Sequence, residues 1–230
     1  MFKKKKILCL VPARGGSKGI KNKNLQKLSK KSLIEITSNF INKIKYIDKK
    51  IISTDSQKIK EVSKKLGFEI INRPKIISGD RVSDYQVIKH ALTVLKKKNL
   101  VFDYLIYLQP TSPIRRKKDL IKNIKTVISN NFDSCWSVSK IDKKFHPLKI
   151  LNIKNRYLKL YNNSHGRKII ARQQLNDSYV RNGIFYIFKC KSLLKYKTIY
   201  LKKCLPAITK YNHINIDTKK DLLIAKKIYN

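Results

Sequence analysis

Residues 6–19 read KILCLVPARGGSKG, and this stretch decides the fold class. Residues 7–11 form a short apolar run that Pro12 ends, which is typical of a buried strand. The loop that follows carries two adjacent glycines between Arg14 and Lys18. In an open α/β sheet, ligands lie at the carboxyl ends of the strands, where this loop falls.

Strand-like and helical patterns alternate along the rest of the chain. Apolar residues recur at helical spacing in residues 32–44, 59–66, 85–95, 120–128 and 218–229. Short strand-like runs lie at residues 51–52, 68–71, 104–108, 134–138 and 183–188. This alternation predicts an α/β protein with three layers, a Rossmann-like arrangement and a mostly parallel sheet.

Residues 140–180 interrupt the alternation, because they are polar and lack a clear helical period. We predict that they form a small inserted lobe. Residues 1–139 and 181–230 then make up the main domain.

Composition limits the class of protein. The 230 residues are 42% apolar, which is enough for one sizeable core. No apolar run approaches the roughly 18 residues of a membrane span.

The lysines at positions 3–6 resemble the start of a signal peptide, but the apolar run behind them is too short, so we expect a core strand there. The four cysteines are far apart, which favours free thiols in a cytoplasmic protein.

The formal charge of +40 suggests a nucleic-acid-binding protein, and this remains an alternative. Only nine of the 54 cationic residues are arginines, the residue type that makes bidentate contacts to phosphates and bases. The lysines are spread along the chain, which also favours a solvated surface without such a role. We therefore do not expect a nucleic-acid partner.

The glycine-containing loop can bind an anion. Gly15 and Gly16 allow successive backbone N–H groups to turn inward, and Arg14 and Lys18 add positive charge. The loop matches neither the Walker A nor the G-x-G-x-x-G pattern. A flexible turn is the alternative, but two cations that bracket two glycines favour a phosphate site.

The loop and several later segments closely resemble, in the same order, the acylneuraminate cytidylyltransferases, the CMP-sialic acid synthetase family. The matching segments are the opening loop with KNL at 23–25, ISTD at 52–55, NRP at 72–74 followed by Asp80 and Ser83, LQPTSP at 108–113, HPLK at 146–149, RQQL at 172–175, NG at 182–183 with Tyr186, and IDT at 216–218 followed by Asp221. Together they span about residues 6–229. The related KDO cytidylyltransferases lack the GGSKG run.

This resemblance implies an enzyme that transfers CMP from CTP to the anomeric hydroxyl of a nine-carbon acidic sugar, an N-acylneuraminate or a related nonulosonic acid. Pyrophosphate is released, Mg²⁺ is the cofactor, and no protein nucleophile is needed. The family's lobe mediates a domain-swapped homodimer that brings apolar residues of one subunit near the other's sugar site. Ile199 and Tyr200 are the candidates for that contribution.

The resemblance also assigns roles to individual residues. The nucleotide-binding candidates are Arg14, Gly15, Gly16, Ser17, Lys18, Asn24, Arg73 and Ser83. The sugar-binding candidates are Gln109, Arg172, Tyr186 and Arg181. The catalytic candidates are Arg172, Lys18 and Arg14, and the metal-binding candidates are Asp217 and Asn215.

Some of these positions allow a second interpretation. Tyr186 lies in an alternating run and could equally belong to the core. The family usually has a carboxylate where this chain has Asn215, which predicts weaker metal binding or a CTP-binding homologue with impaired turnover. Arg181 stands where sialic acid members often have proline, so its contact with substrate is open.

Overall fold

The computed structural model describes residues 1–229, which divide into two compact units. The main unit consists of Met1–Ser137, Asn182–Ala207 and the chain from Tyr211 onward. The small unit consists of Val138–Arg181 and Ile208–Lys210, and it contains the predicted lobe.

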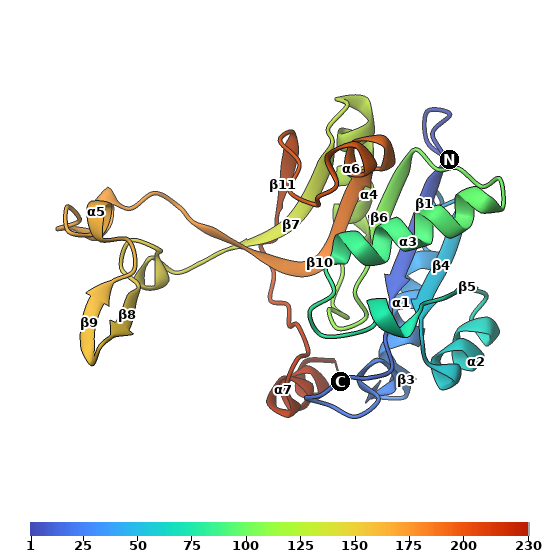
Figure 1. Ribbon diagram of the computed structural model, residues 1–230, viewed down its shortest axis with the longest axis horizontal. Coiled ribbons are helices and arrows are strands. Elements are labelled where there is room, and N and C mark those ends of the chain that lie inside the picture. Colours follow the sequence, from blue (N-terminus) through green and yellow to red (C-terminus); the bar gives the residue numbers. More distant parts are fainter. Residues whose placement is uncertain (230) are drawn as a thin grey trace. The chain divides into compact units, whose positions relative to one another are not determined.

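The main unit is built on a seven-stranded sheet with the order β11-β7-β10-β6-β1-β4-β5 (Figure 1). The strands are β1 (Ile7–Pro12), β4 (Lys49–Thr54), β5 (Glu69–Asn72), β6 (Tyr104–Tyr107), β7 (Ser134–Lys140), β10 (Tyr179–Lys189) and β11 (Cys204–Ile208). Strand β1 pairs in parallel with β4 and β6, β4 pairs in parallel with β5, and β10 runs antiparallel to β6. The predicted mostly parallel sheet is confirmed.

Helices cover both faces of this sheet. They are α1 (Leu33–Asn42), α2 (Gln57–Lys65), α3 (Asp84–Lys97), α4 (Lys117–Ser129) and α6 (Cys190–Tyr196), whereas α7 (Lys219–Tyr229) packs in a separate cluster. Because side chains alternate along a strand, Ile7, Cys9 and Val11 of β1 pack in one cluster with residues of α1 and α4. Leu8 and Leu10 pack in the other cluster, with residues of α3 and α6. The three predicted layers are therefore present.

A third cluster holds the C-terminal helix in place. Leu222 and Ala225 of α7 pack with Leu28 and Leu33, near the hairpin formed by β2 (Lys27–Leu28) and β3 (Lys31–Ser32). Because α7 packs here, the segment before it, which contains Asp217, belongs to the main unit.

The small unit contains the antiparallel hairpin of β8 (Leu151–Lys154) and β9 (Tyr157–Leu160), followed by α5 (Asn163–Gly166). Many of its large apolar side chains are exposed. They include Ile150, Leu151, Ile153, Leu158 and Ile170. Among the helices of residues 1–229, none has the length and apolar character that a membrane crossing requires.

Candidate active site

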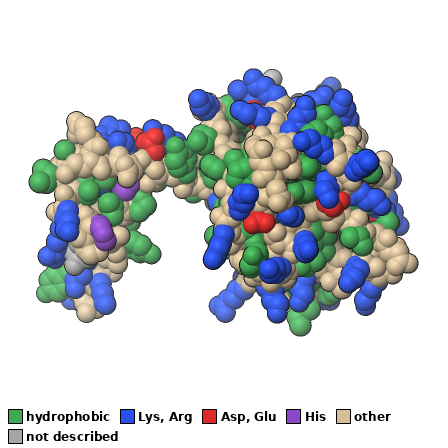
Figure 2. Space-filling view, turned by 90° about the horizontal axis from the view of Figure 1, so that it is seen from above, with side chains coloured by type: hydrophobic (Ala, Val, Ile, Leu, Met, Phe, Trp, Pro, Cys, Tyr) green, Lys and Arg blue, Asp and Glu red, His purple; other side chains and the backbone are tan. Residues whose placement is uncertain are grey.

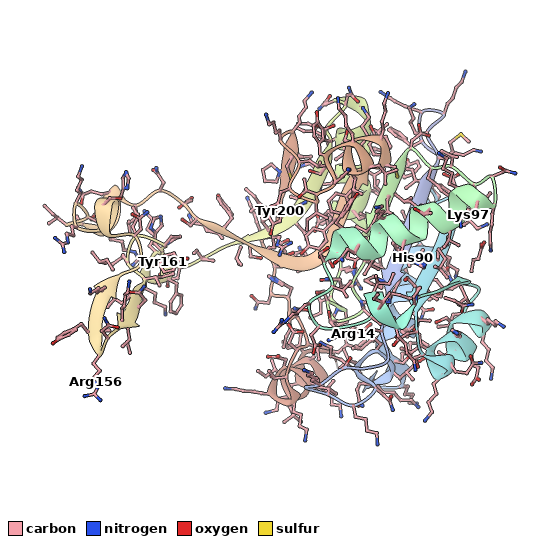
Figure 3. The ribbon with its side chains drawn as sticks, in the orientation of Figure 1. Arg14, His90, Lys97, Arg156, Tyr161 and Tyr200 are labelled. Carbon is pink, nitrogen blue, oxygen red and sulfur yellow. The ribbon has the colours of Figure 1, made fainter. Side chains whose placement is uncertain are left out.

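A cavity of about 370 Å³ opens in the main unit where β1, β5 and β6 end. Its wall comes from the loop after β1, residues 73–87, the loop after β6 and the segment before α7. The carboxyl ends of parallel strands meet at this edge, which is where an open α/β sheet binds its ligands. Arg14, labelled in Figure 3, lies at this edge.

Close contacts shape the loop after β1. The Asp55 carboxylate accepts a hydrogen bond from the Gly15 backbone N–H at 2.8 Å. A Cβ at Gly15 would lie 2.8 Å from the Ser56 Cβ, so the loop can approach α2 this closely only with glycine there. The buried Asn24 side chain donates to the Arg14 carbonyl at 3.0 Å. Asn24 therefore supports the loop that carries Arg14.

Both cations of this loop contact one carboxylate. Arg14 Nη2 pairs with Asp80 Oδ1, and Lys18 Nζ lies 2.8 Å from Asp80 Oδ2. Hydrogen bonds from Lys18 and Arg14 lower the pKa of Asp80 below its ordinary value. An anionic group thus already occupies the position between Arg14 and Lys18, which shows that the geometry there accepts an anion.

Arg73 is a second cation of the cavity wall, and it is only 7% exposed. Its Nε and Nη2 atoms have no hydrogen-bond partner among the described residues. Burial lowers the pKa of its guanidinium, because the low-polarity surroundings disfavour the charged form. Beside it, the Tyr107 hydroxyl donates to Asp84 Oδ1 at 2.9 Å. A buried arginine with unused donors in a cavity is suited to bind a polar ligand.

Asp217 and Asn215 adjoin each other on the same wall. Asp217 Oδ1 lies 2.9 Å from Lys23 Nζ, and Asp217 Oδ2 accepts from the Asn215 amide at 2.7 Å. No cluster of three or more His, Cys, Asp or Glu side chains in the described part of the chain could hold a metal alone. One carboxylate and one amide oxygen fit a Mg²⁺ ion that takes its remaining ligands from phosphates and water.

Gln109 follows β6 and lies against the start of β10. Gly183 has a φ of +73°, and a Cβ there would lie 3.0 Å from Gln109 Oε1 and 2.8 Å from Ser112 Oγ. The Arg115 guanidinium donates to the carbonyls of Gln109 and, at 2.9 Å, of Ile184. Both the backbone conformation and the space at position 183 therefore favour glycine.

The cavity brings together many of the residues that the sequence singled out. Those that line it are Arg14, Ser17, Lys18, Asn24, Arg73, Gln109, Asn215 and Asp217. Gly15 and Gly16 belong to the same loop but do not line the cavity.

Ser83 and Tyr186 lie elsewhere in the main unit. The Ser83 hydroxyl caps α3 by accepting from the Gln86 N–H at 3.3 Å, and the neighbouring Asp84 lines the cavity instead. Tyr186 is 6% exposed and packs with Trp136 and Phe188, as its alternative interpretation as a core residue predicts.

Two predicted arginines belong to the small unit. Arg172 lies in a short 3-10 turn, is exposed, and its Nη2 is 3.5 Å from Asp142 Oδ1. Arg181 is exposed at the start of β10. Their contact with a sugar stays a prediction.

The two candidates for the subunit contact belong to the main unit. Ile199 packs against the core, and the exposed Tyr200 ring lies 5.1 Å from the Trp136 ring (Figure 3). Their predicted role at a partner's sugar site remains a prediction.

The cavity residues that were absent from the sequence-based candidates include Lys23, Asp80, Asp84 and Tyr107. Lys23 lies inside the matched segment KNL at 23–25, and Asp80 follows the matched segment NRP at 72–74. These positions were the signal by which both residues could have been identified. Tyr107 is the second-last residue of the strand predicted at 104–108 and the last residue of β6, and the end of a strand is also a signal for a ligand-binding edge. Asp84 could be identified only once the first residue of α3 was known.

Comparisons with known proteins show which family and which relatives this chain is similar to. A family described as cytidylyltransferase matches residues 8–228. A pseudaminic acid cytidylyltransferase of Campylobacter jejuni is 28% identical, with 97% of this chain and 96% of that protein covered. An N-acylneuraminate cytidylyltransferase of Escherichia coli is 26% identical over 96% of this chain, which spans about half (51%) of that protein.

Solved structures show the same fold. A CMP:2-keto-3-deoxy-manno-octonic acid synthetase complexed with CTP aligns with a TM-score of 0.70 and 14% identity, covering 97% of this chain and 98% of that one. This likeness supports the three-layer α/β arrangement.

Proposed function

The chain belongs to the cytidylyltransferase family, and from this premise we propose that it transfers CMP from CTP to the anomeric hydroxyl of a nonulosonic acid. The relatives named for pseudaminic acid and N-acylneuraminate support this class of acceptor. The observation that carries the proposal is the cavity at the strand ends, where Arg14, Lys18 and the buried Arg73 face a common space.

In this reaction the protein positions the two substrates and neutralises the charge of the phosphates. The sugar's anomeric oxygen attacks the α-phosphorus of CTP and loses its proton to water. The bond from that phosphorus to the bridging oxygen breaks, and pyrophosphate leaves with the electron pair. Arg14 and Lys18 exchange Asp80 for the triphosphate, and Arg73 donates to the nucleotide from its unused nitrogens. Such fixed donors stabilise the charge that develops on the leaving group.

Asp217 and Asn215 would hold the Mg²⁺ ion together with phosphate oxygens. The ion would neutralise part of the charge on the departing pyrophosphate. Lys23, which already contacts Asp217, supplies a further positive charge at the same place. Ser112 donates to Asn215 Oδ1 at 3.3 Å and so orients the amide.

Gln109 and Arg172 are proposed to bind the sugar. Gln109 projects from the end of β6 into the wall of the cavity, next to Gly183. Arg172 offers a planar guanidinium that can bind the sugar's carboxylate with two hydrogen bonds. Lys143 Nζ donates a hydrogen bond to the Arg172 carbonyl at 3.4 Å, so it contacts the turn that carries Arg172.

We also propose that the protein is a cytoplasmic homodimer. Exposed apolar side chains of the small unit, such as Ile153 and Ile170, support a protein contact there. Figure 2 shows lysine and arginine side chains spread over much of the visible surface instead of gathered in one groove. This distribution does not favour a nucleic-acid site.

A substrate panel tests the proposal. Purified protein is incubated with CTP, Mg²⁺ and a series of nonulosonic acids, and pyrophosphate release is measured. We expect release with at least one acid, and loss of nearly all of it in the Arg14→Ala and Arg172→Ala variants. Arg167→Ala, at another exposed arginine of the small unit, is the matched control and should remain active. Absence of release with every acid, from folded protein that binds CTP, would contradict transfer and favour a homologue with impaired turnover.

A further inference from the structure

One part of the cavity wall differs from the cationic loop after β1. Apolar side chains of Ile77, Val82 and Val87 line the cavity there, together with Asp84. Asp84 and Val87 are three residues apart on α3, so they share one face of the helix. Apolar walls with a few fixed polar groups suit a flat heterocyclic ring better than a phosphate.

The Asp84 carboxylate is held in a fixed orientation. Its Oδ1 accepts the hydrogen bond from Tyr107, whose side chain is fully buried at the end of β6. Burial raises the pKa of Tyr107 well above its ordinary value, so the hydroxyl remains a donor. No donor of the described residues bonds to Asp84 Oδ2. This oxygen is available to accept a hydrogen bond from a ligand.

Arg73 supplies the complementary donors on the same wall. Arg73 and Asp84 both line the cavity, so its wall offers guanidinium donors, two of which lack partners among the described residues, and one carboxylate acceptor. Cytosine presents two acceptors, O2 and N3, and one donor, its 4-amino group. Uracil instead has an N–H at N3 and an acceptor oxygen at position 4, which a carboxylate would repel.

We infer that Asp84, positioned by Tyr107, selects cytosine over uracil by accepting a hydrogen bond from the 4-amino group. The inference rests on the proposed function, because it assumes that a pyrimidine nucleotide occupies this cavity. The helix itself does not need Asp84 as a cap, since Ser83 already forms a capping box with Gln86. A site built to hydrogen-bond one group discriminates strongly against an analogue that lacks it.

The test compares CTP with UTP in an Asp84→Asn variant. Dissociation constants are measured by calorimetry without sugar, which separates base selection from transfer. We expect the preference for CTP over UTP to fall by about tenfold or more. CTP should bind more weakly because the acceptor loses its charge, and UTP more tightly because the amide can turn to donate to O4. Tyr107→Phe, which frees the carboxylate, should lower the same preference to a smaller degree.

Asp80→Asn is the matched control. It removes an equal charge at the phosphate end of the same wall, so it should alter CTP and UTP binding by the same factor. If folded Asp84→Asn and Tyr107→Phe proteins both keep the wild-type preference within twofold, the inference is wrong. A protein that prefers CTP in binding but transfers it to no acid would overturn the proposed function and leave this inference standing.

Discussion

Replacing Arg73 with methionine should stabilise the ligand-free protein while it weakens CTP binding. The side chain is 7% exposed, and two of its nitrogens lack partners among the described residues. Burial lowers the pKa of the guanidinium, which shows that the charged form is disfavoured there. Methionine has a similar length, is flexible, and carries no charge that must be desolvated.

The two effects can be given magnitudes. A buried donor without a partner costs about 1–3 kcal/mol, and we count one of the two donors as a lower bound. The free energy of unfolding should therefore rise by about 1–3 kcal/mol, which corresponds to roughly 2–12 °C in Tm for a chain of this size. A hydrogen bond from a charged donor contributes about 1.5–3 kcal/mol, so CTP affinity should fall by about 10- to 150-fold.

Scanning calorimetry without ligand measures the first effect, and CTP titration measures the second. Arg81→Met is the control, because Arg81 is exposed in the same loop and does not line the cavity. It should leave both quantities nearly unchanged. A lower Tm for Arg73→Met than for the wild type would refute the reasoning, since it would show that Arg73 stabilises the fold and is not held in place for a ligand.

Three further predictions concern the metal site, the start of β10 and the thiols. Asn215→Asp should lower the Mg²⁺ concentration for half-maximal activity by about tenfold, since a second carboxylate adds a full charge to the site; an unchanged Mg²⁺ titration would show that position 215 does not bind the ion. Gly183→Ala should lower the Tm and raise KM for the sugar more than KM for CTP, because its Cβ, at a φ of +73°, would lie 3.0 Å from Oε1 of Gln109, the proposed sugar ligand; equal changes in the two constants would argue against it. Burial raises the pKa of Cys9 and Cys190 to about 12, so these thiols should react with a disulfide reagent near pH 8 only after denaturation; rapid reaction in the native protein would contradict their burial.

Strand and helix patterns predicted most of the main unit, because burial on two faces leaves a clear signal. Residues 7–11 were predicted as a strand, and β1 covers Ile7–Pro12. The seven-residue α6 was missed because it has too few turns to show a helical period, and the edge strand β11 was missed because it contains Pro206 and buries only one of its five residues. The hairpin β8–β9 was missed because each strand has only four residues and nearly all of its side chains are exposed, so the alternation of Leu151 and Ile153 with polar residues is too short to stand out.

The cavity residues that could be predicted from the sequence are those that follow a strand. The loop with Arg14 follows β1, Arg73 follows β5, and Gln109 lies just beyond β6. Whether Ser83 or Asp84 lines the cavity depends on where α3 begins. Ser83 caps the helix and Asp84 lines the cavity, and a helix start one residue earlier or later would change these positions.

Side-chain pairing across the chain was not predictable. The contacts of Asp80 with Arg14 and Lys18 join segments more than 60 residues apart, and no local pattern encodes such a contact. Tyr186 shows the same limit, because alternation in β10 does not say which face meets a ligand.

A crystal structure of the protein with CTP and Mg²⁺ tests the central claim most directly. We predict that the triphosphate lies between Arg14 and Lys18 with Asp80 displaced, and that the base contacts Arg73. A nucleotide bound outside this cavity, with the contacts of Asp80 to both cations intact, would contradict the account.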